Sequence, residues 1–145
     1  MTPTHIVVLE DTHERVAWLR ETFPGVEIQH CTNVVDFMKH TRTPCALIIL
    51  DHDLAGELGR SPEAKAIYDR GEAADLHGLT GMDAVRVCDT HTPVVVWSAN
   101  PVWGPNMRNL LDERGVPHVY YPFKADANMA GIIRDAYHSK TGVWV

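Results

Sequence analysis

The chain has 145 residues, 45% of them apolar, and its 13 Lys and Arg against 19 Asp and Glu leave a net charge of −6. This length and apolar content predict a single domain over residues 1–145, and the negative charge argues against general nucleic-acid binding or attachment to anionic membranes. No apolar run approaches the roughly 20 residues that span a bilayer, and no leader pattern is present, so we expect a cytoplasmic protein. Three widely spaced cysteines in apolar stretches predict buried thiols and not a disulfide framework: Cys31, Cys45 and Cys88.

Five short β-branched or aromatic stretches predict strands, and each is followed by a segment that predicts a helix. The strands are expected at residues 6–9, 26–31, 46–50, 94–97 and 116–121. The helices are expected at residues 14–22, 34–41, 81–90, 106–114 and 127–138. Asn33 and Asp126 precede two of these helices and are typical N-cap residues. The alternation predicts an α/β fold in three layers, with a doubly wound parallel sheet covered by helices on both faces.

One connection is much longer than the others. Residues 52–80 link the third strand to the third helix, whereas βα loops usually have two to six residues. We interpret residues from about 54 to 79 as an insertion, with a helix predicted at 62–70. Loops of this length are often functional, so we expect the insertion to lie over the carboxyl ends of the strands as a lid.

Acidic side chains follow two of the predicted strands. Glu10 and Asp11 come after the first strand, and Asp51 and Asp53 come after the third. Ligands in open α/β sheets bind beyond the carboxyl ends of the strands, where these carboxylates can meet. Carboxylate oxygens suit Mg²⁺, or Mn²⁺, so all four are candidate metal ligands, Asp11 and Asp51 foremost. The alternative for Glu10 and Asp53 is that they cap helices or solvate turns.

His52 lies between two of these acids. Its ordinary pKa is close to neutral pH, so it is a candidate general acid or base beside Asp51, the second candidate catalytic residue. A role as a metal ligand or as a structural histidine stays open for His52. His13 and His77 are weaker candidates for the same chemistry.

The fourth strand ends in polar residues that suit a phosphate. Ser98 can hydrogen-bond a phosphoryl oxygen, and Asn100 offers both a donor and an acceptor beside it. Lys124, after the fifth strand, can bring positive charge to the same phosphate. The alternatives are a turn-forming serine and an exposed lysine. Trp97 and Trp103 flank this strand end and either stack on a base or pack in the core.

The order of elements, together with Glu10, Asp11, Asp51, Ser98 and a lysine near the fifth strand, resembles the receiver domains of response regulators over essentially the whole chain. The resemblance implies a flavodoxin-like sheet with strand order 2-1-3-4-5. It also implies that the acids bind Mg²⁺, that Asp51 accepts a phosphoryl group, and that the hydroxyl and the lysine signal its presence. Receivers carry that lysine directly before Pro-Phe, whereas here Lys124 follows Pro122-Phe123.

A narrower subgroup, the cyclic-phosphate-processing receivers, resembles this chain in more motifs. In that subgroup, histidine usually stands directly before the motif that corresponds to Ser98-Ala99-Asn100-Pro101, and here that residue is Trp97. The subgroup is thought to act on cyclic phosphate ends of nucleotides or RNA. The similar motifs are Leu9-Glu10-Asp11-x-x-x-Arg15, Leu50-Asp51-His52-Asp53-Leu54, Thr80-Gly81-Met82-Asp83 and Ser98-Ala99-Asn100-Pro101.

Three functions follow from these patterns. The first is a metal-dependent phosphoesterase, or a protein that binds a cyclic or open phosphate end of a nucleotide or RNA. In it Asp51 and the metal polarise the phosphate, Ser98, Asn100 and Lys124 hold its oxygens, and His52 moves a proton. The second is a receiver phosphorylated on Asp51, with a histidine kinase as partner. The third is a receiver-like interaction module without catalysis.

Overall fold

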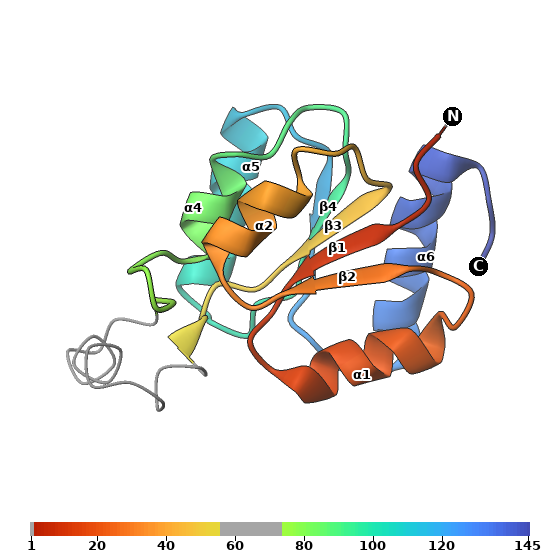
Figure 1. Cartoon of the computed structure of the whole chain (residues 1–145), viewed down its shortest axis with the longest axis horizontal. Coiled ribbons are helices and arrows are strands. Elements are labelled where there is room, and N and C mark those ends of the chain that lie inside the picture. The colour runs from red at the N-terminus through yellow and green to blue at the C-terminus, as the bar shows by residue number, and fades with distance from the viewer. Residues whose placement is uncertain (1, 56–73) are drawn as a thin grey trace.

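A computed structural model describes residues 2–55 and 74–145. Within them, five parallel strands form one sheet in the order β2-β1-β3-β4-β5 (Figure 1). The strands are β1 (Ile6–Leu9), β2 (Ile28–Cys31), β3 (Leu47–Leu50), β4 (Val94–Val96) and β5 (His118–Tyr120). The predicted fold class and strand order are therefore confirmed.

The strands differ in burial according to their place in the sheet. Every side chain of β1, β3 and β4 is buried, which is why these strands read as continuous apolar runs. The edge strands β2 and β5 are shorter than predicted. Val26 donates its backbone N–H to Phe23 in a turn at 3.1 Å instead of joining β2, and Pro117, before β5, has no N–H to donate.

Helices cover both faces of the sheet, as predicted (Figure 1). They are α1 (His13–Thr22), α2 (Val34–His40), α4 (Gly81–Val85), α5 (Trp103–Glu113) and α6 (Ala127–Thr141). Apolar side chains of α1 and α6 form one core with the sheet, and those of α2, α4 and α5 form the other. The three cysteines are buried free thiols, as predicted. Within the described residues, no helix has the length and apolar character that a membrane span requires.

Side chains at the helix ends explain where the helices differ from prediction. Asn33 and Asp126 cap α2 and α6 as expected, each accepting a backbone N–H. The helix predicted at 106–114 begins earlier because Asn100 accepts two backbone N–H groups at the start of α5, at 3.0 and 2.9 Å. The helix predicted at 81–90 ends at Val85, and the chain then turns around Asp89, whose carboxylate accepts N–H groups two and three residues later.

The predicted insertion leaves and rejoins the body beside the carboxyl ends of the strands. Leu54 is buried in the core at the start of the predicted insertion, and Asp75 is buried near its end. The Asp75 carboxylate accepts backbone N–H groups from Val34 at 2.8 Å, His77 at 2.8 Å and Leu79 at 3.0 Å. The bond from Val34 ties the returning chain to the start of α2, and the other two hold the returning segment itself in a turn. The helix predicted at 62–70 and the lid lie outside the described residues, because residues 56–73 are not among them.

Candidate metal and phosphate site

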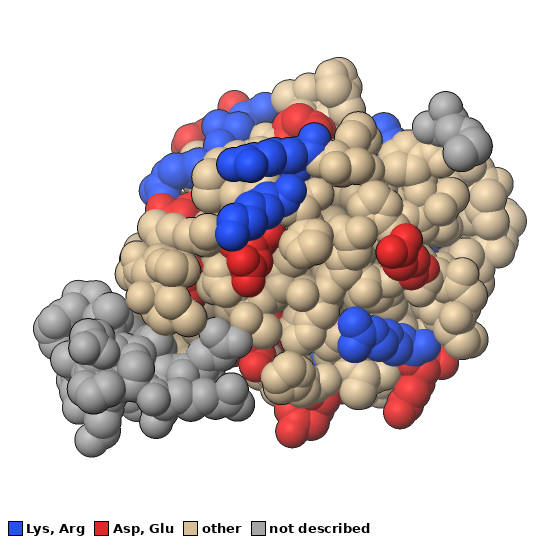
Figure 2. Space-filling view, viewed as in Figure 1, with Lys and Arg blue, Asp and Glu red and all other residues tan. Residues whose placement is uncertain are grey.

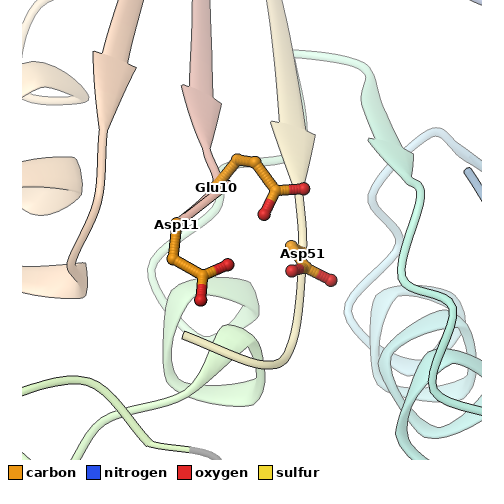
Figure 3. Close-up of side chains that lie close together, drawn as sticks. All are labelled: Glu10, Asp11 and Asp51. Atoms are coloured by element: carbon orange, nitrogen blue, oxygen red, sulfur yellow. The ribbon is translucent and has the colours of Figure 1, made fainter. Parts of the chain in front are cut away.

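Three carboxylates converge at the carboxyl ends of β1 and β3. Glu10, Asp11 and Asp51 each offer an oxygen, and these oxygens all lie within 4.8 Å of one another. Figure 3 shows the three side chains directed toward a common space beyond the strand ends. The sequence therefore predicts correctly that these acids meet.

The sheet register explains this convergence. Leu9 pairs with Leu50, so the next residues, Glu10 and Asp51, emerge at the same level. Both residues extend the sheet hydrogen bonds by one step: Glu10 donates its N–H to Cys31 at 2.9 Å, and Asp51 donates to Leu9 at 3.0 Å. The backbone that carries the two carboxylates is thus fixed by the sheet.

Burial gives this cluster unusual electrostatics. Glu10 is fully buried, and burial, followed by the charge of Asp51, raises the pKa of Glu10 to about 9. Burial also raises the pKa of Asp51, to about 6. Two buried carboxylates this close cannot both ionise without a counter-charge. Three carboxylate oxygens form a donor set that suits Mg²⁺ or Mn²⁺, and such an ion would supply the missing positive charge.

Arg15 is a site residue that the strand-end argument missed. It extends from α1, and its Nη1 lies 3.1 Å from Oε1 of Glu10 and 3.9 Å from Oδ1 of Asp51. Its guanidinium carbon lies 4.8 Å from the centre of the Phe123 ring. The sequence places Arg15 inside a family-like motif, yet only the packing of α1 beside the sheet reveals its contact with the acids.

Asp53 lies apart from the three clustered carboxylates. One of its oxygens is 2.6 Å from Nδ1 of His52, and both accept from the side-chain amide of Asn100 at 3.3 Å. His52 is buried, and its ring stacks on that of Trp103 with centroids 5.0 Å apart. The structure thus joins His52, Asp53 and Asn100 in one hydrogen-bonded chain.

Two predicted phosphate contacts, Ser98 and Lys124, lie in different surroundings. Ser98 is buried at the end of β4, and its hydroxyl accepts the backbone N–H of Asn100 at 3.1 Å. Lys124 is exposed and does not line the pocket described below. Trp97 is buried and packs edge-on against Phe123 at 5.0 Å, so its alternative role in the core is the one observed.

An open pocket of about 390 Å³ lies over the carboxylates. Its lining is mostly polar and comes from all three strand ends: Asp11, Thr12, Arg15, Asp51, Asp53, Ala99, Asn100 and Pro101. A second hollow of about 330 Å³ lies between β4, β5 and α6 at the opposite end of the sheet, with a mainly apolar lining. Because the first pocket is lined by two of the clustered carboxylates, Asp11 and Asp51, we take it as the candidate site.

Charges on the molecular surface are mixed. On the face shown in Figure 2, Lys and Arg side chains lie beside Asp and Glu side chains. Neighbouring residues also form ion pairs on the surface, such as Lys39 with Asp36 at 3.9 Å and Arg86 with Asp83 at 2.9 Å. This surface contrasts with the pocket, where several acids face Arg15.

Solved structures resemble this one over nearly its whole length. A receiver domain from Clostridium thermocellum matches with a TM-score of 0.59 and 15% identity, over 94% of this chain and 96% of that one. The chain has the receiver-domain fold. The receiver of a sensor histidine kinase from Pseudomonas aeruginosa matches with a TM-score of 0.57 and 14% identity, over 97% and 99% of the two chains, and holds a magnesium ion in its active-site cleft.

The response regulator LqsR of Legionella pneumophila also matches, with a TM-score of 0.63 and 11% identity, over 96% of this chain and 44% of that one. No family model matches the sequence, and no curated protein does. The resemblance to receivers is therefore supported at the level of the fold, and these matches give no support to the cyclic-phosphate-processing subgroup.

Proposed function

We propose that this chain is a receiver that binds Mg²⁺ and accepts a phosphoryl group on Asp51. The observation that carries the proposal is the convergence of Glu10, Asp11 and Asp51 within 4.8 Å, under a pocket and on a receiver fold. A histidine kinase or a small phosphodonor would supply the phosphoryl group. Both fit a cytoplasmic protein, the compartment that we expect from the sequence.

The residues of the pocket have distinct roles in this reaction. A carboxylate oxygen of Asp51 forms a bond to phosphorus, and the bond between phosphorus and the donor's leaving group breaks, with its electron pair on the leaving group. The pKa of Asp51, about 6, leaves it largely ionised and able to attack at neutral pH. Glu10, Asp11 and Asp51 would hold the metal, which supplies positive charge to the phosphoryl oxygens. Asn100 lines the pocket, and its side-chain amide, which bonds Asp53, would turn to donate to the same oxygens.

Intact-mass measurement tests this proposal. The protein is incubated with acetyl phosphate and Mg²⁺, and the expected result is the addition of one phosphoryl group. Asp51→Asn should abolish the addition, and chelation of the metal should suppress it. Asp112→Asn is a matched control, because Asp112 is an exposed acid on α5 that pairs with His118 at 3.2 Å. No added mass in the unmodified protein, or equal addition to Asp51→Asn, contradicts the proposal.

A second candidate is the metal-dependent phosphoesterase, acting on a cyclic phosphate end of a nucleotide or RNA. The hydrogen-bonded chain of His52, Asp53 and Asn100 beside the pocket favours it, because an acid–histidine pair is a common proton-transfer device. Water would add its oxygen to phosphorus and lose a proton to His52, one phosphorus–ribose oxygen bond would break, and His52 would pass the proton to the released oxygen. Incubation with a 2′,3′-cyclic nucleotide and Mg²⁺ or Mn²⁺, followed by chromatography, tests this. Ring opening that is lost in both Asp51→Asn and His52→Gln supports the esterase, and an intact ring contradicts it.

A further inference from the structure

Arg15 brings the only pocket-lining positive charge within the described residues. Its side chain is 24% exposed, so it lies between the buried acids and the open pocket. It bonds Glu10 at 3.1 Å, whereas its separation of 3.9 Å from Asp51 is too long for a hydrogen bond. The guanidinium is thus held next to Asp51 without being fully engaged by it.

Phe123 fixes the position of this guanidinium. The Arg15 guanidinium lies over the Phe123 ring, and that ring meets Trp18 and Trp97 edge-on, with centroids 5.5 and 5.0 Å apart. Phe123 also donates its backbone N–H to Trp97 at 2.8 Å. The attraction between a cation and such an anchored aromatic face holds the Arg15 guanidinium beside the acids.

We infer that Arg15 is the cation that binds the phosphoryl group on Asp51, an inference that rests on the proposed function above. Phosphorylation changes the charge at Asp51 from −1 to about −2 and adds acceptor oxygens on the pocket side. A guanidinium binds such oxygens with paired, charge-assisted hydrogen bonds. Lys124 is exposed and does not line the pocket, whereas Arg15 lines it and lies 3.9 Å from Asp51. Arg15 is therefore the cation in position to bind the phosphoryl group.

If Arg15 binds the phosphoryl group, its loss should slow phosphorylation and leave Mg²⁺ affinity almost unchanged. If Arg15 only held the acids in position, its loss would lower both the rate and the affinity. Arg15 is a cation and therefore no metal ligand, and its side chain is 24% exposed, so solvent screens its repulsion of Mg²⁺. Mg²⁺ affinity should therefore change by less than about fivefold when Arg15 is lost. The phosphoryl group, in contrast, loses charge-assisted hydrogen bonds, so phosphorylation should slow by about 10- to 100-fold.

The test compares four variants with the unmodified full chain: Arg15→Gln, Arg15→Lys, Lys124→Gln and Arg20→Gln. Calorimetry measures Mg²⁺ affinity, and intact mass follows the initial rate of phosphorylation by acetyl phosphate. Arg15→Gln should lose rate and keep Mg²⁺ affinity, and Arg15→Lys should recover part of the rate. Arg20→Gln is the matched control, because Arg20 lies on the same helix and contacts the backbone of Ile28 at 3.4 Å, away from the pocket.

The outcomes separate the inference from the function on which it rests. A normal rate in Arg15→Gln, or a larger loss in Lys124→Gln than in Arg15→Gln, overturns the role of Arg15 while the function stands. Equal losses of rate and Mg²⁺ affinity in Arg15→Gln also overturn it, because Arg15 would then only position the acids. An unmodified protein that is not phosphorylated at all overturns the proposed function and the inference together.

Discussion

Glu10→Gln should make the protein more stable at high pH. The pKa of Glu10 is about 9 in the folded chain and 4.5 for an ordinary glutamate. Between these values the unfolded chain releases a proton that the folded chain keeps. The unfolded state therefore binds fewer protons, and the free energy of unfolding falls as pH rises through this window.

The magnitude follows from the proton count. One proton of difference corresponds to about 1.4 kcal/mol per pH unit, so the unmodified protein should lose at most about 2.7 kcal/mol between pH 6 and pH 8 through this group. Sharing of the proton with Asp51 reduces this value. Glutamine keeps the shape of the protonated acid without titrating, so Glu10→Gln should match the unmodified protein near pH 5 and exceed it increasingly toward pH 8.

Urea unfolding at pH 5, 6, 7 and 8 measures the effect as a difference between two proteins, in which the nine histidines cancel. Glu14→Gln, an exposed acid in the first turn of α1, is the control and should change stability by less than about 0.5 kcal/mol at every pH. Added Mg²⁺ should stabilise the unmodified protein at pH 8 more than it stabilises Glu10→Gln. A stability difference that does not grow with pH refutes the reasoning about the buried carboxylate pair.

Three other substitutions, the first with Gly131→Ala as its control, test how the fold holds the site, each by urea unfolding. Gly81→Ala should destabilise by about 1–3 kcal/mol, because a Cβ there would collide with the carbonyl oxygen of Asp51, whereas Gly131→Ala in α6 meets nothing within 4 Å and should stabilise by about 0.5–1 kcal/mol. Asp75→Ala should cost about 1–3 kcal/mol by leaving the buried N–H of Val34 at the start of α2 unpaired, and it should speed the hydrogen exchange of that N–H. Trp103→Ala should cost about 0.5–1.5 kcal/mol through loss of the stack on His52.

Each of these predictions has a contrary result. Equal effects of Gly81→Ala and Gly131→Ala would mean that α4 does not pack closely on the end of β3. Unchanged exchange in Asp75→Ala would mean that the returning chain does not cap α2. A neutral Trp103→Ala would mean that His52 is held by Asp53 alone.

The central part of the site was predictable because it depends on short-range sequence pattern. Buried strands can be recognised in the sequence as apolar runs. The residues directly after them, Glu10 and Asp51, can therefore be assigned to one edge of the sheet. The strand order that the resemblance to receiver domains implies then places the first and third strands side by side. Neither step requires knowledge of side-chain packing.

The surroundings of the site depend on contacts between distant segments, and these the sequence does not show. Arg15 reaches the acids only because α1 packs near Phe123, which is far away in the chain. Asp75 caps a helix that begins 41 residues earlier. The local pattern also does not reveal the early start of α5, because the acceptor of its first N–H groups is the side chain of Asn100, which precedes the helix.

A crystal structure with Mn²⁺ and beryllofluoride, a mimic of the phosphoryl group, tests the central claim most directly. The account predicts an anomalous peak among Glu10, Asp11 and Asp51, with beryllium bound to a carboxylate oxygen of Asp51. A metal peak away from these three carboxylates, or beryllofluoride bound elsewhere while Asp51 is bare, would contradict it.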